Sequence, residues 1–327
     1  MTISELHSRC RQYEVRRTNM EATQKAMLVT NDGLLRIDGH LWTYPMTTWA
    51  LNQLCRRLEV PYGFMRKCPN DLMSIVLNRW VEIKADRDAH LCIMTYGTGP
   101  QAVGIVSPRY IPYKYPDFVM DVGNSMQDVS HDIDSIHLGD RCLDCDVLFP
   151  EMCMDIPIDG VQHRFMAGIH LRNSDVGYSA AIAAMIIRNT TSGWSLGFDR
   201  LVGYSFARTT HVGDHDEFPA EVGVLVRSID TNWISILDRI AATTEFNITV
   251  ENIRDLITSN GFAKDILDGR LGIEVFADDT DTDSRMALYN IIDGLATQAS
   301  EVDCPMRWNL ERICGDIIIS FEDALRW

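Results

Sequence analysis

The sequence has few lysines, no long apolar run and no glycine-rich nucleotide-binding loop. Only five of its 30 basic residues are lysines. No stretch of about 18 apolar residues occurs, so we expect no membrane-spanning helix. The N-terminal stretch lacks the apolar middle of a signal peptide, which leads us to expect a cytoplasmic location. Neither GxxxxGK[ST] nor GxGxxG between a strand and a helix is present, and we expect no nucleophile elbow. The sequence therefore predicts a non-enzymatic protein without a cofactor.

Two groups of residues resemble metal sites without matching one. Cys142 and Cys145 form a single CxxC, whereas a closed zinc site needs four thiolate or imidazole ligands in close pairs. The same segment is a predicted strand, which would send the two side chains to opposite faces. Residues 278–283 alternate aspartate and threonine but lack the glycine and glutamate of an EF-hand loop. We interpret the cysteines as packing residues and the acidic run as a solvated loop, and we predict no bound metal.

Charge is distributed unevenly along the chain. The net charge is −16, but residues 1–115 carry an excess of five positive charges and the remainder an excess of 21 negative charges. Arginine, the dominant cation, is well suited to bidentate phosphate contacts and to stacking on bases. A second interpretation is an acidic solvated surface with ordinary ion pairs, since net charge alone says little about partners.

Hydrophobic periodicity predicts an α+β protein. Helical spacing begins after Thr47 and again near Asn70, and a hairpin is predicted over 89–107 around a Gly/Pro turn. Strands are expected at 142–149, 164–172, 180–188 and 194–207, with one helix near 118–126. Beyond residue 215 the period becomes helical over 222–240, near 253–257, over 286–295 and from Pro305 on.

These elements predict two regions. Residues 1–215 would form a mixed core around a mostly antiparallel sheet with flanking helices. Residues 216–327 would form an acidic helical region packed on that core or extending it. The apolar stripe over 222–240 and the apolar cluster over 313–321 exceed what one sheet face comfortably covers, so we expect a homo-oligomer.

One segment combines aromatic and basic residues. Arg109, Tyr110, Tyr113 and Lys114 lie within residues 107–115, after a predicted strand. Aromatic faces for bases and cations for phosphates are what single-stranded nucleic acid needs. The other interpretation is a proline-rich loop whose tyrosines pack on the sheet.

A second segment is locally basic within the acidic part of the chain. Residues 160–212 hold five arginines, among them Arg172 and Arg188, against two aspartates. Turn-forming residues flank the apolar run 180–187 on both sides. These arginines could meet phosphates, or could pair with the acidic helices that follow.

In their order along the chain, several blocks resemble the phage- and plasmid-borne family of the domain of unknown function 932. The blocks are residues 58–61, 64–65, 104–112, 173–177, 187–193, 288–292 and 307–315. The family typically has a cysteine after the arginine of the 187–193 block; this chain has Asn189 instead, so no role of that cysteine carries over. The resemblance implies a mobile-element setting and no established activity. By analogy only, the resemblance implies a distant relation to the ring-forming single-strand annealing proteins.

Two hypotheses follow. In the first, a phage or plasmid protein of DNA replication and recombination binds single-stranded DNA, with strand annealing as a further expectation, through Arg109, Tyr110, Tyr113, Lys114, Arg172 and Arg188. In the second, a non-enzymatic module inhibits or remodels a host protein through its acidic C-terminal surface, mimicking the charge of DNA.

Overall fold

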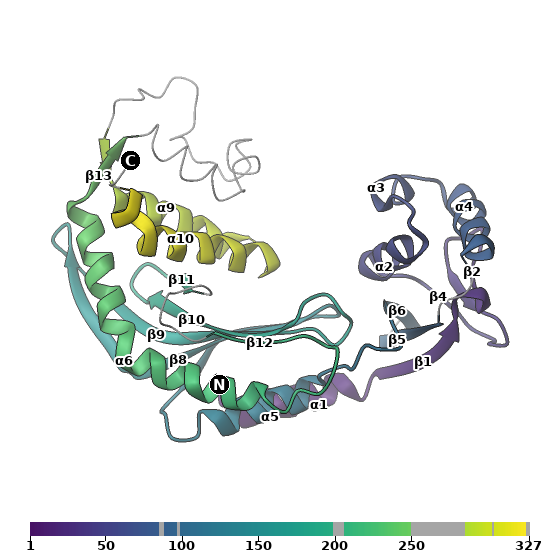
Figure 1. Cartoon of the computed structure of the whole chain (residues 1–327), viewed down its shortest axis with the longest axis horizontal. Coiled ribbons are helices and arrows are strands. Elements are labelled where there is room, and N and C mark those ends of the chain that lie inside the picture. The colour runs from purple at the N-terminus through teal and green to yellow at the C-terminus, as the bar shows by residue number, and fades with distance from the viewer. Residues whose placement is uncertain (85–87, 97–98, 199–205, 250–284, 303, 325–327) are drawn as a thin grey trace.

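The computed structural model describes residues 1–84, 88–96, 99–198, 206–249, 285–302 and 304–324. Its larger lobe is built on a six-stranded antiparallel sheet with strand order β11-β10-β9-β8-β7, and β12 pairs with β10. The strands are β7 (Asp132–Leu138), β8 (Leu143–Ile158), β9 (Val161–Asn173), β10 (Ala181–Asn189), β11 (Trp194–Phe198) and β12 (Ala207–Thr209). The predicted α+β class with a mostly antiparallel sheet is confirmed (Figure 1).

Five helices share one hydrophobic core with this sheet. They are α1 (Ile3–Glu14), α5 (Tyr115–Ser125), α6 (Phe218–Glu245), α9 (Leu288–Glu301) and α10 (Cys304–Ala324). The long α6 contacts β8, β9, β10 and β12, while α9 and α10 pack against β11. A short ribbon of β13 (Asn247–Thr249) and β14 (Arg285–Ala287) follows α6 and precedes α9.

The smaller lobe has its own core. It contains the sheet β1-β5-β6, made of β1 (Arg17–Thr23), β5 (Asp88–Tyr96) and β6 (Gly99–Val106). A second sheet joins β2 (Met27–Val29), β3 (Leu35–Ile37) and β4 (Thr43–Tyr44). Three helices cover them, α2 (Thr48–Leu58), α3 (Tyr62–Met65) and α4 (Asn70–Ile83), and the buried cluster runs from Met27 to Ile105.

The smaller lobe is inserted into the larger one. Helix α1 precedes it and packs against α5, which follows it, as the contact of Ile3 with Gly123 shows. The buried cluster of the smaller lobe therefore begins after α1 and ends with β6. The division into 1–215 and 216–327 stays a prediction about folding units, and the second region contributes directly to the larger core.

Most predicted elements are confirmed near their expected ends. Thr47 caps α2 by accepting a hydrogen bond from the N–H of Ala50, and α4 begins at Asn70. The hairpin β8–β9 is longer than predicted, because residues 150–158 continue the strand into a turn at Asp159 and Gly160, both with positive φ. The predicted helix near 253–257 and the acidic loop 278–283 lie outside the described residues.

The apolar stripes that led us to expect self-association lie inside the chain. Val222, Ile229 and Ile240 of α6 are fully buried, and so is Ile318 of α10. The apolar residues of α6, α9 and α10 are buried together with those of the sheet in a single cluster. The premise that these helices carry more apolar surface than one sheet face can cover was therefore wrong. A homo-oligomer stays a prediction without that support.

No helix within the described residues is long and apolar enough to cross a membrane.

Candidate functional site

A groove lies where the two lobes meet. Its lining residues come from α2, from the end of β6 and the loop after it, and from the loop between β9 and β10: Trp49, Gln53, Arg56, Arg57, Ile105, Val106, Ser107, Tyr110 and Gly177. The volume of this junction groove is about 230 Å³. It therefore combines two guanidinium groups with two aromatic rings beside an apolar floor.

Hydrogen bonds to the turn 173–177 position three of the side chains that line the groove. The carbonyl of Val176 in this turn accepts hydrogen bonds from Trp49 Nε1 at 3.2 Å and from Gln53 Nε2 at 2.9 Å. The hydroxyl of Tyr110 donates to the carbonyl of Ser174 and accepts from the N–H of Gly177 at 2.9 Å. Because Trp49 and Tyr110 bind backbone atoms of this turn, their rings have fixed positions in the groove.

A close approach explains Gly104 at the base of this contact. A Cβ at Gly104 would lie 2.9 Å from Cβ of Val176, closer than real side-chain carbons approach. The glycine thus lets the turn of the larger lobe seat directly on β6.

Of the two cations in the groove, Arg56 is exposed and Arg57 is half-buried. Arg57 also donates from Nη2 to the carbonyl of Asp88 at 2.6 Å, which fixes its guanidinium group. Both follow the buried Leu54 and Cys55 at the C-terminal end of α2, so the helix presents them on its polar side.

The six predicted binding residues do not form one groove. Arg109 is exposed and Tyr110 lines the junction groove. Tyr113 is buried, donates to Asp121 and stacks on His215 with ring centroids 4.4 Å apart. Lys114 is exposed, with Nζ 3.8 Å from a Glu14 carboxylate oxygen.

The two remaining residues lie on the six-stranded sheet. Arg172 is buried and forms an ion pair with Asp144. Arg188 is half-buried, with Nη2 3.3 Å from a carboxylate oxygen of Asp134, and it donates to Ser195. Tyr113 thus belongs to the interior, which agrees with the packing interpretation of the tyrosines. The ion-pair partners of Arg172 and Arg188 lie on β8 and β7, strands of the same sheet that precede them in the chain.

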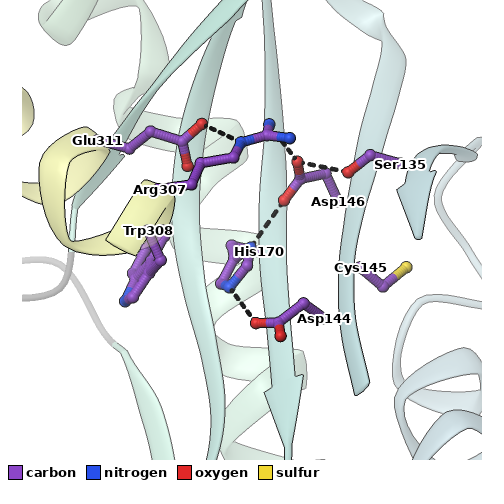
Figure 2. A pocket seen from close by; sticks show the side chains of 8 residues that line it. All are labelled: Ser135, Asp144, Cys145, Asp146, His170, Arg307, Trp308 and Glu311. Carbon is purple, nitrogen blue, oxygen red and sulfur yellow. Dashed lines mark hydrogen bonds and ion pairs between the residues drawn. The ribbon is translucent and has the colours of Figure 1, made fainter. Parts of the chain in front are cut away.

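A network of buried charges forms a second polar centre (Figure 2). Asp146 on β8 accepts hydrogen bonds from Ser135 at 2.7 Å, from Nδ1 of His170 at 2.7 Å and from Arg307 of α10 at 3.0 Å. Nε2 of His170 lies 3.4 Å from Asp144. The imidazole stacks on Trp308, with ring centroids 4.3 Å apart and planes 8° apart.

The network sets the protonation of its members. Burial alone would lower the pKa of His170, but hydrogen bonds to Asp144 and Asp146 outweigh it and raise the pKa to about 9. Burial alone would raise the pKa of both aspartates, but the hydrogen bonds of His170 and the charges of His170 and nearby arginines hold it below the ordinary value. Burial raises the pKa of Glu311.

This network holds α10 on the sheet and leaves no room for a substrate. Its cavity volume is about 10 Å³, enough for about one water molecule. The Ser135 hydroxyl points to a carboxylate and not to His170, so it is not activated as a nucleophile. The charges pair with one another, which is the arrangement of a structural polar core, although Nε2 of His170 makes no well-formed hydrogen bond and only faces Asp144 at 3.4 Å.

Within the described residues, no group of three or more His, Cys, Asp or Glu side chains could hold a metal ion. Cys145 lies in the larger core, whereas Cys142 donates from Sγ to Asp144 in the charge network. Cys142, just before β8, thus lies on the side of Asp144, and Cys145 lies on the opposite side of the sheet.

The sequence prediction missed Trp49, Arg56 and Arg57. The adjacent arginines on the polar side of a predicted amphipathic helix were the available signal. These residues lie near Tyr110 only because one lobe is inserted into the other, and no local sequence pattern indicates that insertion.

A scan against models of known protein families found no match to this chain, and searches of curated proteins and of solved structures found none either. The resemblance to the 932 family stays a prediction.

Proposed function

We propose that this protein binds single-stranded nucleic acid in the junction groove and catalyses no reaction. The observation that carries the proposal is the convergence of Arg56 and Arg57 with the rings of Trp49 and Tyr110 in one groove. Cations that meet phosphates, combined with aromatic faces on which bases stack, are the common features of single-strand binding sites. Arg109, exposed next to Tyr110, adds a cation at the rim.

The local charge suits a polyanion even though the protein is acidic. The groove cations all belong to residues 1–115, the part of the chain with an excess of positive charge. Because exposed charges farther apart than about 10 Å are largely screened at 0.1 M salt, the local balance matters more than the net charge. Charge around the groove therefore favours phosphate binding.

The experiment measures the affinity of the full-length protein for a fluorescent oligothymidylate across a salt series. We expect log Kd to rise linearly with log salt concentration, because phosphate contacts release counterions. Arg56→Gln should weaken binding and reduce the slope by about 1, the effect of one lost phosphate contact.

Arg36→Gln is the matched control, since Arg36 is exposed on β3 and does not line the groove. It should leave affinity and slope unchanged. Folded protein that does not bind the strand at low salt, or equal losses in both variants, would reject the proposal.

Strand annealing by a homo-oligomer in a phage or plasmid setting is a further part of the proposal, supported by the resemblance alone. Light scattering over a concentration series, with and without single-stranded DNA, measures the assembly. Annealing of two complementary labelled strands measures the activity. A monomeric mass under all conditions, together with no acceleration of annealing, would leave a simple single-strand binder.

The outward face of α6 supports a second candidate, a module that binds a basic host protein. Exposed acidic residues outnumber the one exposed arginine, Arg227, along this helix and its N-cap: Glu217, Glu221, Asp230, Asp238 and Glu245. Deletion of 216–327 cannot test this, because it would remove buried residues of the larger core. The double change Asp230→Lys/Asp238→Lys keeps the core; if it leaves every captured partner bound, this candidate fails.

A further inference from the structure

The polar atoms of the groove side chains are already engaged with the backbone. The amide of Gln53 donates to the carbonyl of Val176 at 2.9 Å, and its oxygen accepts from the N–H of Ile105 at 2.8 Å. Trp49 Nε1 donates to the same carbonyl at 3.2 Å. The Tyr110 hydroxyl both donates and accepts within the turn contact.

Reading a base requires donors and acceptors aimed at its edges. Since Gln53, Trp49 and Tyr110 use theirs in contacts with the backbone, these side chains offer a ligand apolar surface. Part of each ring already contacts a neighbour, because the centroid of Trp49 lies 4.9 Å from that of Tyr178 and the centroid of Tyr110 lies 4.9 Å from that of His211. Ser107 adds one hydroxyl, which can either donate or accept and so discriminates poorly between bases. The guanidinium groups of Arg56 and Arg57 only donate, and they suit phosphate oxygens.

The size of the groove limits its occupant. A volume of about 230 Å³ falls below the about 300–1,000 Å³ typical of sites for drug-sized ligands. A groove of this volume suits a ligand smaller than a typical drug molecule, such as one base with its phosphate. The rings are also held in place before binding, so stacking costs little side-chain entropy.

We propose that the junction groove takes up one unpaired base of a strand by stacking, without reading which base it is, while Arg56 and Arg57 hold the adjoining phosphate. This inference rests on the proposed function and specifies its recognition mode. It requires an unpaired base, because a base within a duplex has no free face.

The test compares strands of equal length and charge. The full-length protein is titrated with an oligothymidylate and with a strand of the same length whose bases are replaced by abasic sites. We expect the abasic strand to bind about tenfold more weakly or worse, since stacking on an aromatic side chain contributes that much per base. Oligomers of dT, dC and dA should bind within a few-fold of one another.

Two variants assign the preference to Trp49. Trp49→Leu and Trp49→Phe both lose the hydrogen bond to Val176, but only the phenylalanine keeps a ring. Trp49→Leu should therefore lose the preference for the base-containing strand, and Trp49→Phe should retain most of it. Arg56→Gln should weaken both strands equally and leave their ratio unchanged.

The outcomes separate the two proposals. Equal affinity for intact and abasic strands would overturn the stacking inference and leave a phosphate-binding groove. A strong preference for one base would overturn the claim that base identity is not read. Absence of binding by every strand would reject the proposed function itself, and the inference with it.

Discussion

Arg17 of β1 and Asp175 of the turn between β9 and β10 form an ion pair across the two lobes. Their side chains are 3% and 1% exposed, although 158 residues separate them in the chain. Arg17 also donates to the backbone carbonyl of Asp175. The pair is part of the contact that positions the walls of the junction groove.

Loss of one partner should destabilise the protein strongly. Asp175→Asn leaves the buried guanidinium without its counter-charge, and breaking a buried pair in this way typically costs about 3–5 kcal/mol. We expect a lower midpoint of urea unfolding measured by circular dichroism. The double change Arg17→Met/Asp175→Leu removes both charges, so it should be less destabilising than Asp175→Asn. A single variant as stable as the natural protein would contradict this prediction.

A second prediction concerns the contact of α10 with β11. A Cβ at Gly315 would overlap the carbonyl oxygen of Gly197, which is backbone and cannot turn away. Overpacking of this kind costs about 1–3 kcal/mol or more. Gly315→Ala should therefore lower the midpoint of thermal unfolding.

Gly294→Ala is the matched control in the neighbouring helix. Gly294 is exposed within α9, and an added Cβ would meet nothing within 4 Å. Alanine in a helix interior is more stable than glycine by about 0.5–1 kcal/mol, so this variant should unfold at a higher temperature. Equal shifts in the two alanine variants would contradict the close contact of α10 with β11.

Local sequence patterns predicted most helices and strands, because these elements depend on residues that are close together in the sequence. The cap at Thr47, the apolar spacing of α4 and the continuous apolar run of β10 all specify structure within a few residues. The N-terminal helix was missed although Thr2 and Glu5 form a capping box, because the stretch is short and mostly polar.

The site depended on relations that the sequence does not display. Arg172 is as basic as Arg56 in the sequence, but Asp144 lies opposite it on the adjacent strand and neutralises it in the interior. Tyr110 and Tyr113 differ by three positions, yet one lines a groove and the other stacks on His215. Cross-strand register and lobe insertion decide these outcomes, and neither is local.

The last prediction concerns the charge network under α10. Asp144, Asp146, Arg172, Arg307 and Glu311 surround or adjoin His170, whose pKa rises from 6.5 to about 9 on folding. The network holds the imidazole in its charged form, stacked on Trp308.

Proton linkage determines whether the protein becomes more or less stable as pH rises. Below about pH 6.5 both folded and unfolded states hold the proton, so the stabilisation is fully present. Between pH 6.5 and 9 only the folded state holds it, and His170 alone should contribute a fall of about 1.4 kcal/mol per pH unit to the free energy of unfolding. The stabilisation is lost as pH rises through about 9. The two aspartates, whose pKa values are lowered, contribute no slope in this window.

Urea unfolding at several pH values between 6.5 and 8.5 measures this slope, below the range in which tyrosines ionise. His170→Gln keeps a hydrogen-bond donor but cannot titrate. The slope of its free energy of unfolding against pH should therefore be smaller, by the equivalent of about one bound proton. His137→Gln, at an exposed position on strand β7 and outside the charge network, is the matched control. Comparing slopes rather than absolute stabilities separates proton linkage from any general weakening of the core. If His170→Gln retained the full pH dependence, the buried imidazole would be neutral in the folded protein, and α10 would be held by Arg307 and packing alone.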